Sequence, residues 1–291
     1  MNRITGQDLI NKILETDEVE LTCEVFDNSA LTVIEFSGLE KSITLKNVVF
    51  SNPVVFKNLQ LKCVLKFYDC TFRGDITFDN CQLKAISGEH YYTVYLHNCD
   101  FNNNNFFVKN NCFFYSTFEI SFAKVLKTID IQESVFTQFN LKRTELNGKL
   151  LLSTNEFKQG LRIEESTIIS NVRHSSNSYG SLVWMNTTFK KKVFLKDSVL
   201  NDHISIQDCS FEDTINIDPY NKMVPNSVLN VIDNKFKKEF TVSYYKKIGQ
   251  NVITGGAETI YIFSNEFDDG IFISGDNIGP NANLKTLWID M

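Results

Sequence analysis

The sequence predicts an all-β protein that folds as a single right-handed parallel β-helix, with four short faces per coil and a short N-terminal capping helix. Two observations predict this class. An eight-residue pattern of apolar positions returns about every eleven residues over most of the 291-residue chain. Phenylalanine is abundant, with 25 residues against 4 prolines, as expected if stacked rings fill the interior.

The repeating unit itself explains the geometry. In LKFYDCTF, which begins at Leu65, apolar residues stand at offsets 0, 2 and 7 and a small residue stands at offset 5. Residues two apart in a strand point to the same side, so offsets 0 and 2 form one short strand and offsets 5 and 7 another. The odd steps between them require turns. Two units therefore make one coil of roughly 22 residues, and parallel strands of successive coils stack about 4.8 Å apart.

The pattern continues along the chain. It also begins at Ile43, Val54, Ile76, Val94, Ile129, Phe139, Leu150, Leu161, Leu182, Val193, Ile204, Leu229, Ile260 and Ile271, and fits less well at Phe106, Phe118, Ile215 and Phe240. From this range we expect an N-terminal cap over residues 1–30 and the β-helix over residues 31–291.

Three offsets have distinct compositions. Offset 4 is rich in Asn and Asp, which tolerate left-handed backbone at turns. Offset 5 holds small residues, such as Cys70, Cys81 and Ser134, which suit a narrow corner. Offset 7 predicts an aromatic column of Phe50, Phe72, Phe101, Phe113, Phe136, Phe157, Phe189, Phe211, Phe236 and Phe267.

The segments CTFRG, ITFDN and CQLKA resemble the pentapeptide-repeat family, over about residues 40–275. This chain departs from the family pattern in two ways. Asn or Asp usually precedes the small residue instead of following it, and the faces alternate between five and six residues. The resemblance implies a β-helical scaffold. It also implies one alternative function, because some pentapeptide-repeat proteins mimic duplex DNA and bind type II topoisomerases.

Each end of a solenoid needs a cover. Residues 5–18 predict a short amphipathic helix, with capping-box spacing between Thr5 and Asp8 and an apolar stripe at Leu9, Ile10, Ile13 and Leu14. At the C-terminus, LKTLWIDM begins another unit. Either Trp288 closes the helix, or a further segment or a partner subunit in an oligomer does.

Interruptions of the repeat predict loops at 86–93, 169–181, 219–228, 246–259 and 277–286, and the last four follow the same half of the coil. Loops gathered on one side of a rigid solenoid are typical binding surfaces. Our preferred reading is a non-enzymatic scaffold that binds another macromolecule, most readily a protein. The candidate binding residues are Tyr91, Tyr92, Arg173, His174, Tyr179, Tyr220 and Lys247, because Tyr and Arg are favoured at binding hot spots.

Other chemistry is weakly indicated. The net charge of −6 disfavours nucleic acid and anionic membranes as partners. We expect no cofactor, no metal and no catalytic residue, since the histidines and cysteines lack metal-ligand spacing. A polysaccharide-active enzyme is the enzymatic alternative, using Glu164, Glu165, Asp197 and Asp208 with Arg143 or Arg162. The chain shows no secretory signal and no membrane span, and seven cysteines are odd in number, so we expect the cytoplasm.

Overall fold

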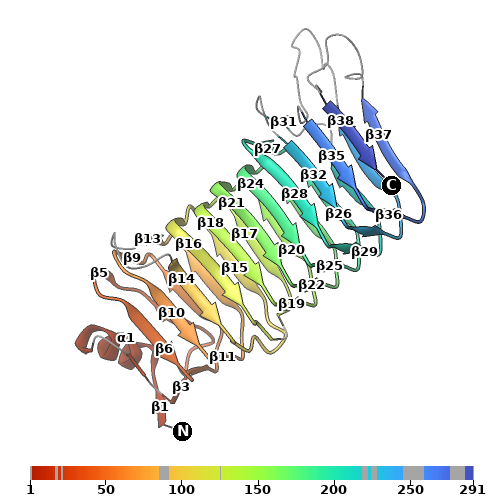
Figure 1. Ribbon diagram of the computed structural model, residues 1–291. Helices are drawn as coiled ribbons and strands as arrows, with labels where there is room; N and C mark the ends of the chain where they lie inside the picture. Colours follow the sequence, from red (N-terminus) through yellow and green to blue (C-terminus); the bar gives the residue numbers. More distant parts are fainter. Residues whose placement is uncertain are drawn as a thin grey trace. The chain divides into compact units, whose positions relative to one another are not determined.

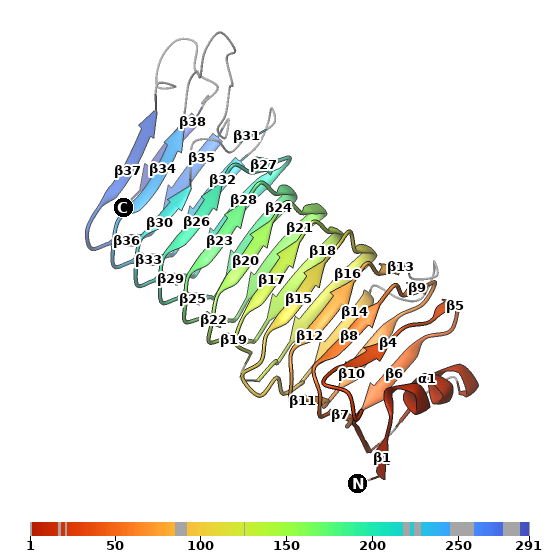
Figure 2. The same ribbon diagram turned by 180° about the vertical axis from the view of Figure 1, so that it is seen from behind.

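The computed structural model describes residues 2–16, 19–20, 22–84, 92–124, 126–217, 222–223, 228–244, 259–275 and 286–290. It confirms the predicted class, a right-handed parallel β-solenoid with about 22 residues per coil and a short helix at the N-terminus. Two compact units divide the chain at Gly148 and Lys149. In both, the described strands pair in parallel with the equivalent strands of neighbouring coils (Figures 1 and 2).

In the first unit, Met1–Gly148, each coil has two long faces and two short ones. The first long face contains β2 (Val19–Glu20), β6 (Ile43–Lys46), β10 (Leu65–Tyr68), β14 (Tyr92–His97), β16 (Phe113–Ser121) and β18 (Val135–Lys142). The second contains β4 (Thr32–Ile34), β8 (Val54–Lys57), β12 (Ile76–Asp79), β15 (Phe106–Lys109) and β17 (Ile129–Gln132). The short strands are β1 (Asn2–Ile4), β3 (Cys23–Val25), β5 (Ser37–Leu39), β7 (Val49–Phe50), β9 (Gln60–Leu61), β11 (Thr71–Phe72), β13 (Gln82–Leu83) and β19 (Glu145–Leu146).

The second unit, Lys149–Met291, repeats this plan. Its first long face contains β21 (Glu156–Glu164), β24 (Ser178–Met185), β28 (His203–Gln207), β32 (Val228–Ile232), β35 (Thr259–Phe263) and β38 (Thr286–Asp290). Its second contains β20 (Leu150–Ser153), β23 (Val172–Ser175), β26 (Val193–Lys196), β30 (Ile215–Ile217), β34 (Phe240–Tyr244) and β37 (Ile271–Gly275). The short strands are β22 (Thr167–Ile168), β25 (Thr188–Phe189), β27 (Val199–Leu200), β29 (Ser210–Phe211), β31 (Lys222–Met223), β33 (Lys235–Phe236) and β36 (Glu266–Phe267).

Stacked phenylalanine rings fill the interior, as the offset-7 column predicts. In the second unit the rings of Phe189 and Phe211 lie 4.8 Å apart and 3° from parallel, and Phe236 continues the stack 5.0 Å from Phe211. In the first unit Phe50 stacks on Phe72 at 5.0 Å. The ring spacing is close to the strand spacing, so each coil adds one ring to the column.

Left-handed residues form the corners. Offset 4 has a positive φ in coil after coil, for example 54° at Asp69, 53° at Asn80 and 50° at Asp197. Asn and Asp adopt this conformation at low cost, which explains their enrichment there. Glu133, with a φ of 49°, occupies the same corner although its residue type is less suited to it.

The prediction that Phe113 belongs to the aromatic column is wrong. Asn110 and Asn111 both have positive φ, so this corner contains one residue more than its neighbours. Cys112 takes the small position, where its Sγ accepts a hydrogen bond from the backbone of Cys81 at 3.3 Å. Consequently Phe114, and not Phe113, points inward and stacks on Phe136 at 4.9 Å.

The predicted N-terminal helix is confirmed as α1 (Gly6–Glu15). Thr5 and Asp8 form the predicted capping box, in which the Thr5 hydroxyl accepts from the Asp8 backbone at 3.1 Å. Leu9, Ile10 and Ile13 are buried, whereas Leu14 is exposed. In the part of the chain that the structure describes, no helix is long and apolar enough to cross a membrane.

The predicted loop at 169–181 is wrong. Residues 172–175 form β23 and residues 178–181 begin β24, so this stretch is an ordinary part of a coil. It escapes the apolar pattern because His174 and Tyr179 take the inward offsets 2 and 7. The other predicted loops lie largely outside the described residues, although Tyr92, Val228, Thr259 and Thr286 at their margins belong to strands.

Candidate functional site

Aromatic side chains gather on the outward side of the first long face in the first unit. Tyr95 and His97 occupy the outward positions of β14, and Tyr68 of β10 pairs in register with His97. The Tyr95 ring lies 4.9 Å from that of Tyr92, 5.4 Å from His97 and 5.6 Å from Tyr68. Phe122, at the following corner, contacts His97 at 5.0 Å. We name these five residues the tyrosine face.

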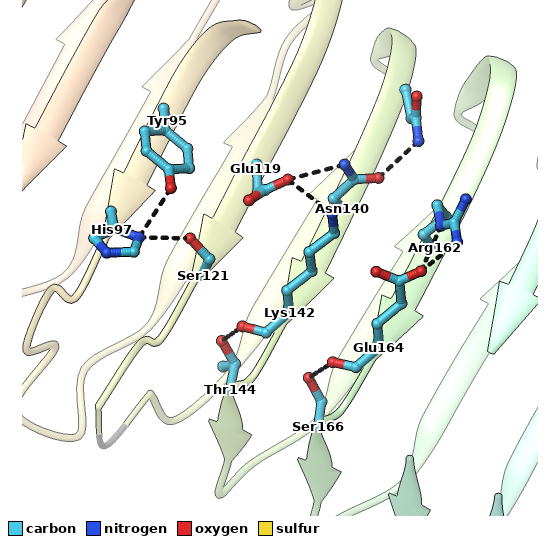
Figure 3. Close-up of polar contacts among 11 residues, drawn as sticks. Tyr95, His97, Glu119, Ser121, Asn140, Lys142, Thr144, Arg162, Glu164 and Ser166 are labelled. Carbon is cyan, nitrogen blue, oxygen red and sulfur yellow. Dashed lines mark hydrogen bonds and ion pairs between the residues drawn. The ribbon is translucent and has the colours of Figure 1, made fainter. Parts of the chain in front are cut away.

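Hydrogen bonds fix the centre of the tyrosine face. Nδ1 of His97 lies 2.9 Å from the Tyr95 hydroxyl and 3.1 Å from Oγ of Ser121 on β16 (Figure 3). Nε2 of the same ring has no hydrogen-bond partner within the described residues. These bonds hold the histidine in one orientation among the surrounding rings.

A polar network continues the face on β16 and β18. Glu119 points outward yet is only 4% exposed. Its carboxylate accepts from Nδ2 of Asn140 at 3.0 Å and lies 3.4 Å from Nζ of Lys142 (Figure 3). Gln138 in turn donates to Asn140 at 2.9 Å. Buried polar groups are stable when they are satisfied in this way, and the network keeps its side chains in fixed positions.

Two hydroxyls of the tyrosine face, those of Tyr68 and Tyr92, keep their protons. Burial raises the pKa of Tyr68, and burial together with the negative charge of Glu119 raises the pKa of Tyr92. At neutral pH both phenols are therefore hydrogen-bond donors on an apolar ring. Arg143 adds a cation, with its guanidinium 5.1 Å above the ring of Phe122.

The candidate residues from the sequence that the structure describes do not form one site. Tyr92 belongs to the tyrosine face, and Arg173 lies on the outward side of β23 in the second unit. His174 and Tyr179 are buried inside the second unit, both with 0% exposure. Tyr91, Tyr220 and Lys247 lie outside the described residues.

His174 belongs to a buried polar cluster. Its Nδ1 lies 2.8 Å from the Tyr179 hydroxyl, and its ring packs edge-on to Trp184 with centroids 6.0 Å apart. Burial lowers the pKa of His174 from 6.5 to about 3. Neither Nε2 of His174 nor Nε1 of Trp184 has a hydrogen-bond partner in the described part of the chain. The imidazole is thus a neutral core group, and not an exposed binding residue.

The carboxylates of the enzymatic alternative are dispersed. Glu164 forms an ion pair with Arg162 on the outward side of β21 (Figure 3). Glu165 and Asp208 sit at corners after the first long face, whereas Asp197 follows β26 on the second. General acid–base chemistry on a sugar needs two carboxylates flanking one bond, and these side chains do not converge in that way.

The cysteines form part of the interior. All seven are buried free thiols. Burial raises the pKa of both Cys63 and Cys209 to about 12, so their thiolates are scarce at neutral pH. Among the residues that the structure describes, no group of three His, Cys, Asp or Glu side chains could hold a metal ion.

Sequence reasoning missed Tyr68, Tyr95 and His97. The signal was present at offsets 1 and 3 of LKFYDCTF and VYLHNCDF, which point outward and would normally be polar. Aromatic residues at these offsets in successive coils predict an outward cluster. Comparison with protein-family models, with curated proteins and with solved structures finds no match.

Proposed function

We propose that this protein is a non-enzymatic β-helical scaffold that binds another protein through the tyrosine face. One observation carries the proposal: five aromatic rings pack together on the outside of a sheet, where they are only partly covered. Tyrosine, histidine and arginine offer apolar area together with hydrogen-bond donors, and Tyr and Arg are enriched at hot spots. A rigid sheet presents them at low entropic cost.

Preorganisation supports this reading. Tyr95 is held by stacking and by its bond to His97, so little side-chain freedom remains to be lost on binding. The satisfied network around Glu119 resembles the polar rim of an interface, with Lys142 and Arg143 nearby. An incoming protein surface would need apolar groups opposite the rings and acceptors opposite the phenols.

We further propose that the coil is a variant of the pentapeptide repeat. The left-handed corner at offset 4, the small residue at offset 5 and the stacked ring at offset 7 support that relationship. Mimicry of DNA is less favoured, because the second unit pairs its acids with lysines. Glu212, for example, lies 2.6 Å from Nζ of Lys190 and 3.6 Å from that of Lys237.

Two further proposals complete this function. The buried free thiols suit a reducing compartment, so we place the protein in the cytoplasm. At the C-terminal end, Trp288 and Ile289 of β38 are 57% and 41% exposed. We propose that a second copy of this chain packs against these two side chains. Light scattering of the wild type and of Trp288→Ser over a range of concentrations tests that contact.

A matched pair of variants tests the tyrosine face. Tyr95→Ser removes its central ring, and Tyr261→Ser removes an outward tyrosine from β35, where Tyr261 stacks on Phe263. We expect affinity capture from native cytosol, followed by calorimetry with the purified partner, to give binding by the wild type and by Tyr261→Ser. Tyr95→Ser should bind about 30-fold more weakly, the effect of losing a hot-spot residue. Retention of every captured protein by a folded Tyr95→Ser variant would refute the proposal.

A further inference from the structure

A second surface, in the second unit, has the character of a small-molecule site. A cavity of about 380 Å³ opens on the outward side of the second long face. Residues that line it include Lys149, Leu151, Arg173, Phe194, Lys196 and Asn216. Its volume lies at the lower end of the range for pockets that bind small molecules, and it is too small for a folded partner.

The parallel register builds this pocket. Leu151 pairs with Arg173, Arg173 with Phe194, and Phe194 with Asn216, so the four side chains form one outward column across β20, β23, β26 and β30. Neighbours in such a column lie about 4.8 Å apart. Arg173 is therefore held between two apolar side chains, and the ring of Phe194 separates it from an amide.

The pocket carries uncompensated positive charge. Lys149, Arg173 and Lys196 contribute three cations, and the lining contains no carboxylate. None of the three has an ion-pair partner among the described residues. By contrast, Lys190, Lys235 and Lys238 of the same unit each lie within 3.0 Å of a carboxylate oxygen. Like charges that share a concave surface attract an anion.

The remaining lining adds shape and polarity. The Phe194 ring is 37% exposed, which leaves an aromatic surface available for stacking. Oδ1 of Asn216 is buried and has no hydrogen-bond partner in the described part of the chain. Buried acceptors are normally satisfied, so this oxygen is available to a donor on a ligand.

We propose that this pocket binds a small organic anion, in which a carboxylate or phosphate group is attached to a flat ring. The oxyanion contacts Arg173 with Lys149 or Lys196, since a guanidinium matches the geometry of both groups. The ring lies against Phe194, and a hydroxyl or amino substituent can donate to Asn216. The site is separate from the tyrosine face, and each proposal can fail without the other.

A larger cavity in the first unit also has an aromatic residue, Tyr115, in its lining, but its lining contains a carboxylate. It measures about 450 Å³ and is lined in part by Glu40, Lys62 and Lys84. Nζ of Lys62 lies 2.8 Å from the Glu40 carboxylate, so part of its charge is already neutralised. For this reason the anion proposal applies to the pocket at Arg173.

Four probes separate the parts of the proposal. Phenyl phosphate and benzoate combine a ring with an oxyanion, benzyl alcohol has the ring alone, and inorganic phosphate has the charge alone. Ligand-observed nuclear magnetic resonance titrations of the full chain measure each dissociation constant. We expect phenyl phosphate or benzoate to bind at least about tenfold more tightly than either single-feature probe, and binding to weaken as salt screens the charges.

Variants then locate the site. Arg173→Gln and Phe194→Ser should each weaken binding of the preferred probe about tenfold or more, as expected for loss of a charge-assisted hydrogen bond or of a stacked ring. Lys158→Gln on β21 removes the same charge from an exposed position outside the pocket and should leave binding unchanged. Equal binding by Arg173→Gln and the wild type would overturn the proposal. Binding of benzyl alcohol as tight as that of the better of phenyl phosphate and benzoate would also overturn it. So would absence of binding by all four probes.

Discussion

The buried pair of His174 and Tyr179 gives a prediction with a defined pH dependence. In the neighbouring coils the equivalent inward residues are Leu152 and Leu195 beside His174, and Phe157 and Leu200 beside Tyr179. The double variant His174→Leu/Tyr179→Phe therefore restores the apolar repeat. Replacing both partners of a buried hydrogen bond by apolar groups is close to neutral or stabilising at neutral pH, whereas Tyr179→Phe alone should cost about 1–3 kcal/mol.

The magnitude follows from the pKa of His174. Its value is about 3 in the folded protein against 6.5 without burial. Because the folded state resists protonation, the wild type has its full stability above pH 6.5 and loses it as the pH falls towards 3. The loss from this histidine is about 2 kcal/mol at pH 5 and about 4 kcal/mol at pH 3. The double variant lacks this titration. Between pH 7.5 and pH 5, its free energy of unfolding should therefore fall by about 2 kcal/mol less than that of the wild type.

Urea unfolding at pH 7.5 and pH 5 measures this difference. Trp184 packs against His174 and is 1% exposed, so its fluorescence reports on the cluster itself. A Trp288→Phe background removes the signal of the exposed tryptophan. All other titrating groups are common to both proteins and cancel in the comparison. If the wild type and the double variant lose the same free energy between the two pH values, His174 is not a buried neutral base and the reasoning is refuted.

Three other predictions concern the coil itself. Phe114→Ala should lower the free energy of unfolding by about 3–5 kcal/mol. Phe113→Ala, on a half-buried residue, should lower it by less than about 1 kcal/mol. Equal losses for the two variants in urea unfolding would contradict the assigned register. Glu133→Gly should raise the melting temperature, because it removes about 1 kcal/mol of backbone strain from a residue with left-handed φ. A lower melting temperature for this variant would contradict the left-handed conformation of Glu133. The thiols of Cys63 and Cys209, both with a pKa raised to about 12, should react with a disulfide reagent only at the rate of unfolding, and rapid reaction of the native protein would show that they are accessible.

The fold was predictable because the interior of a solenoid is one-dimensional. Each coil repeats the same constraints, so apolar offsets, left-handed corners and stacked rings could be recognised many times over. The errors occurred where one coil differs from its neighbours. Two consecutive left-handed asparagines, Asn110 and Asn111, shift the count by one residue, and the inward His174 and Tyr179 give a polar stretch that is typical of a loop.

The candidate sites were less predictable, for a different physical reason. The predicted binding residues were assigned to loops, whereas most residues of the tyrosine face and of the pocket at Arg173 lie on strands. Outward offsets vary freely, so Tyr95 or Phe194 carries little information alone. Their meaning comes from the neighbours in the next coils, Tyr68 and Arg173, which are 27 and 21 residues away in the chain. Such residues are brought together by the register between strands of neighbouring coils. Inserted residues shift this register, so the pairs cannot be read from a fixed spacing in the sequence.

The asparagines inside the second unit have a consequence for folding. Asn177 accepts from the backbone and side chain of Asn155 at 2.9 and 3.1 Å, and Asn265 does the same for Asn234 at 2.9 and 3.0 Å. A chain built from similar coils can misalign by skipping one of them, with most apolar contacts preserved. A skipped coil would separate these amides from their partners and leave buried groups unsatisfied, at about 1–3 kcal/mol each. The asparagine pairs therefore make the native order of coils more stable than misaligned arrangements. They disfavour misfolding as well as stabilise the native state.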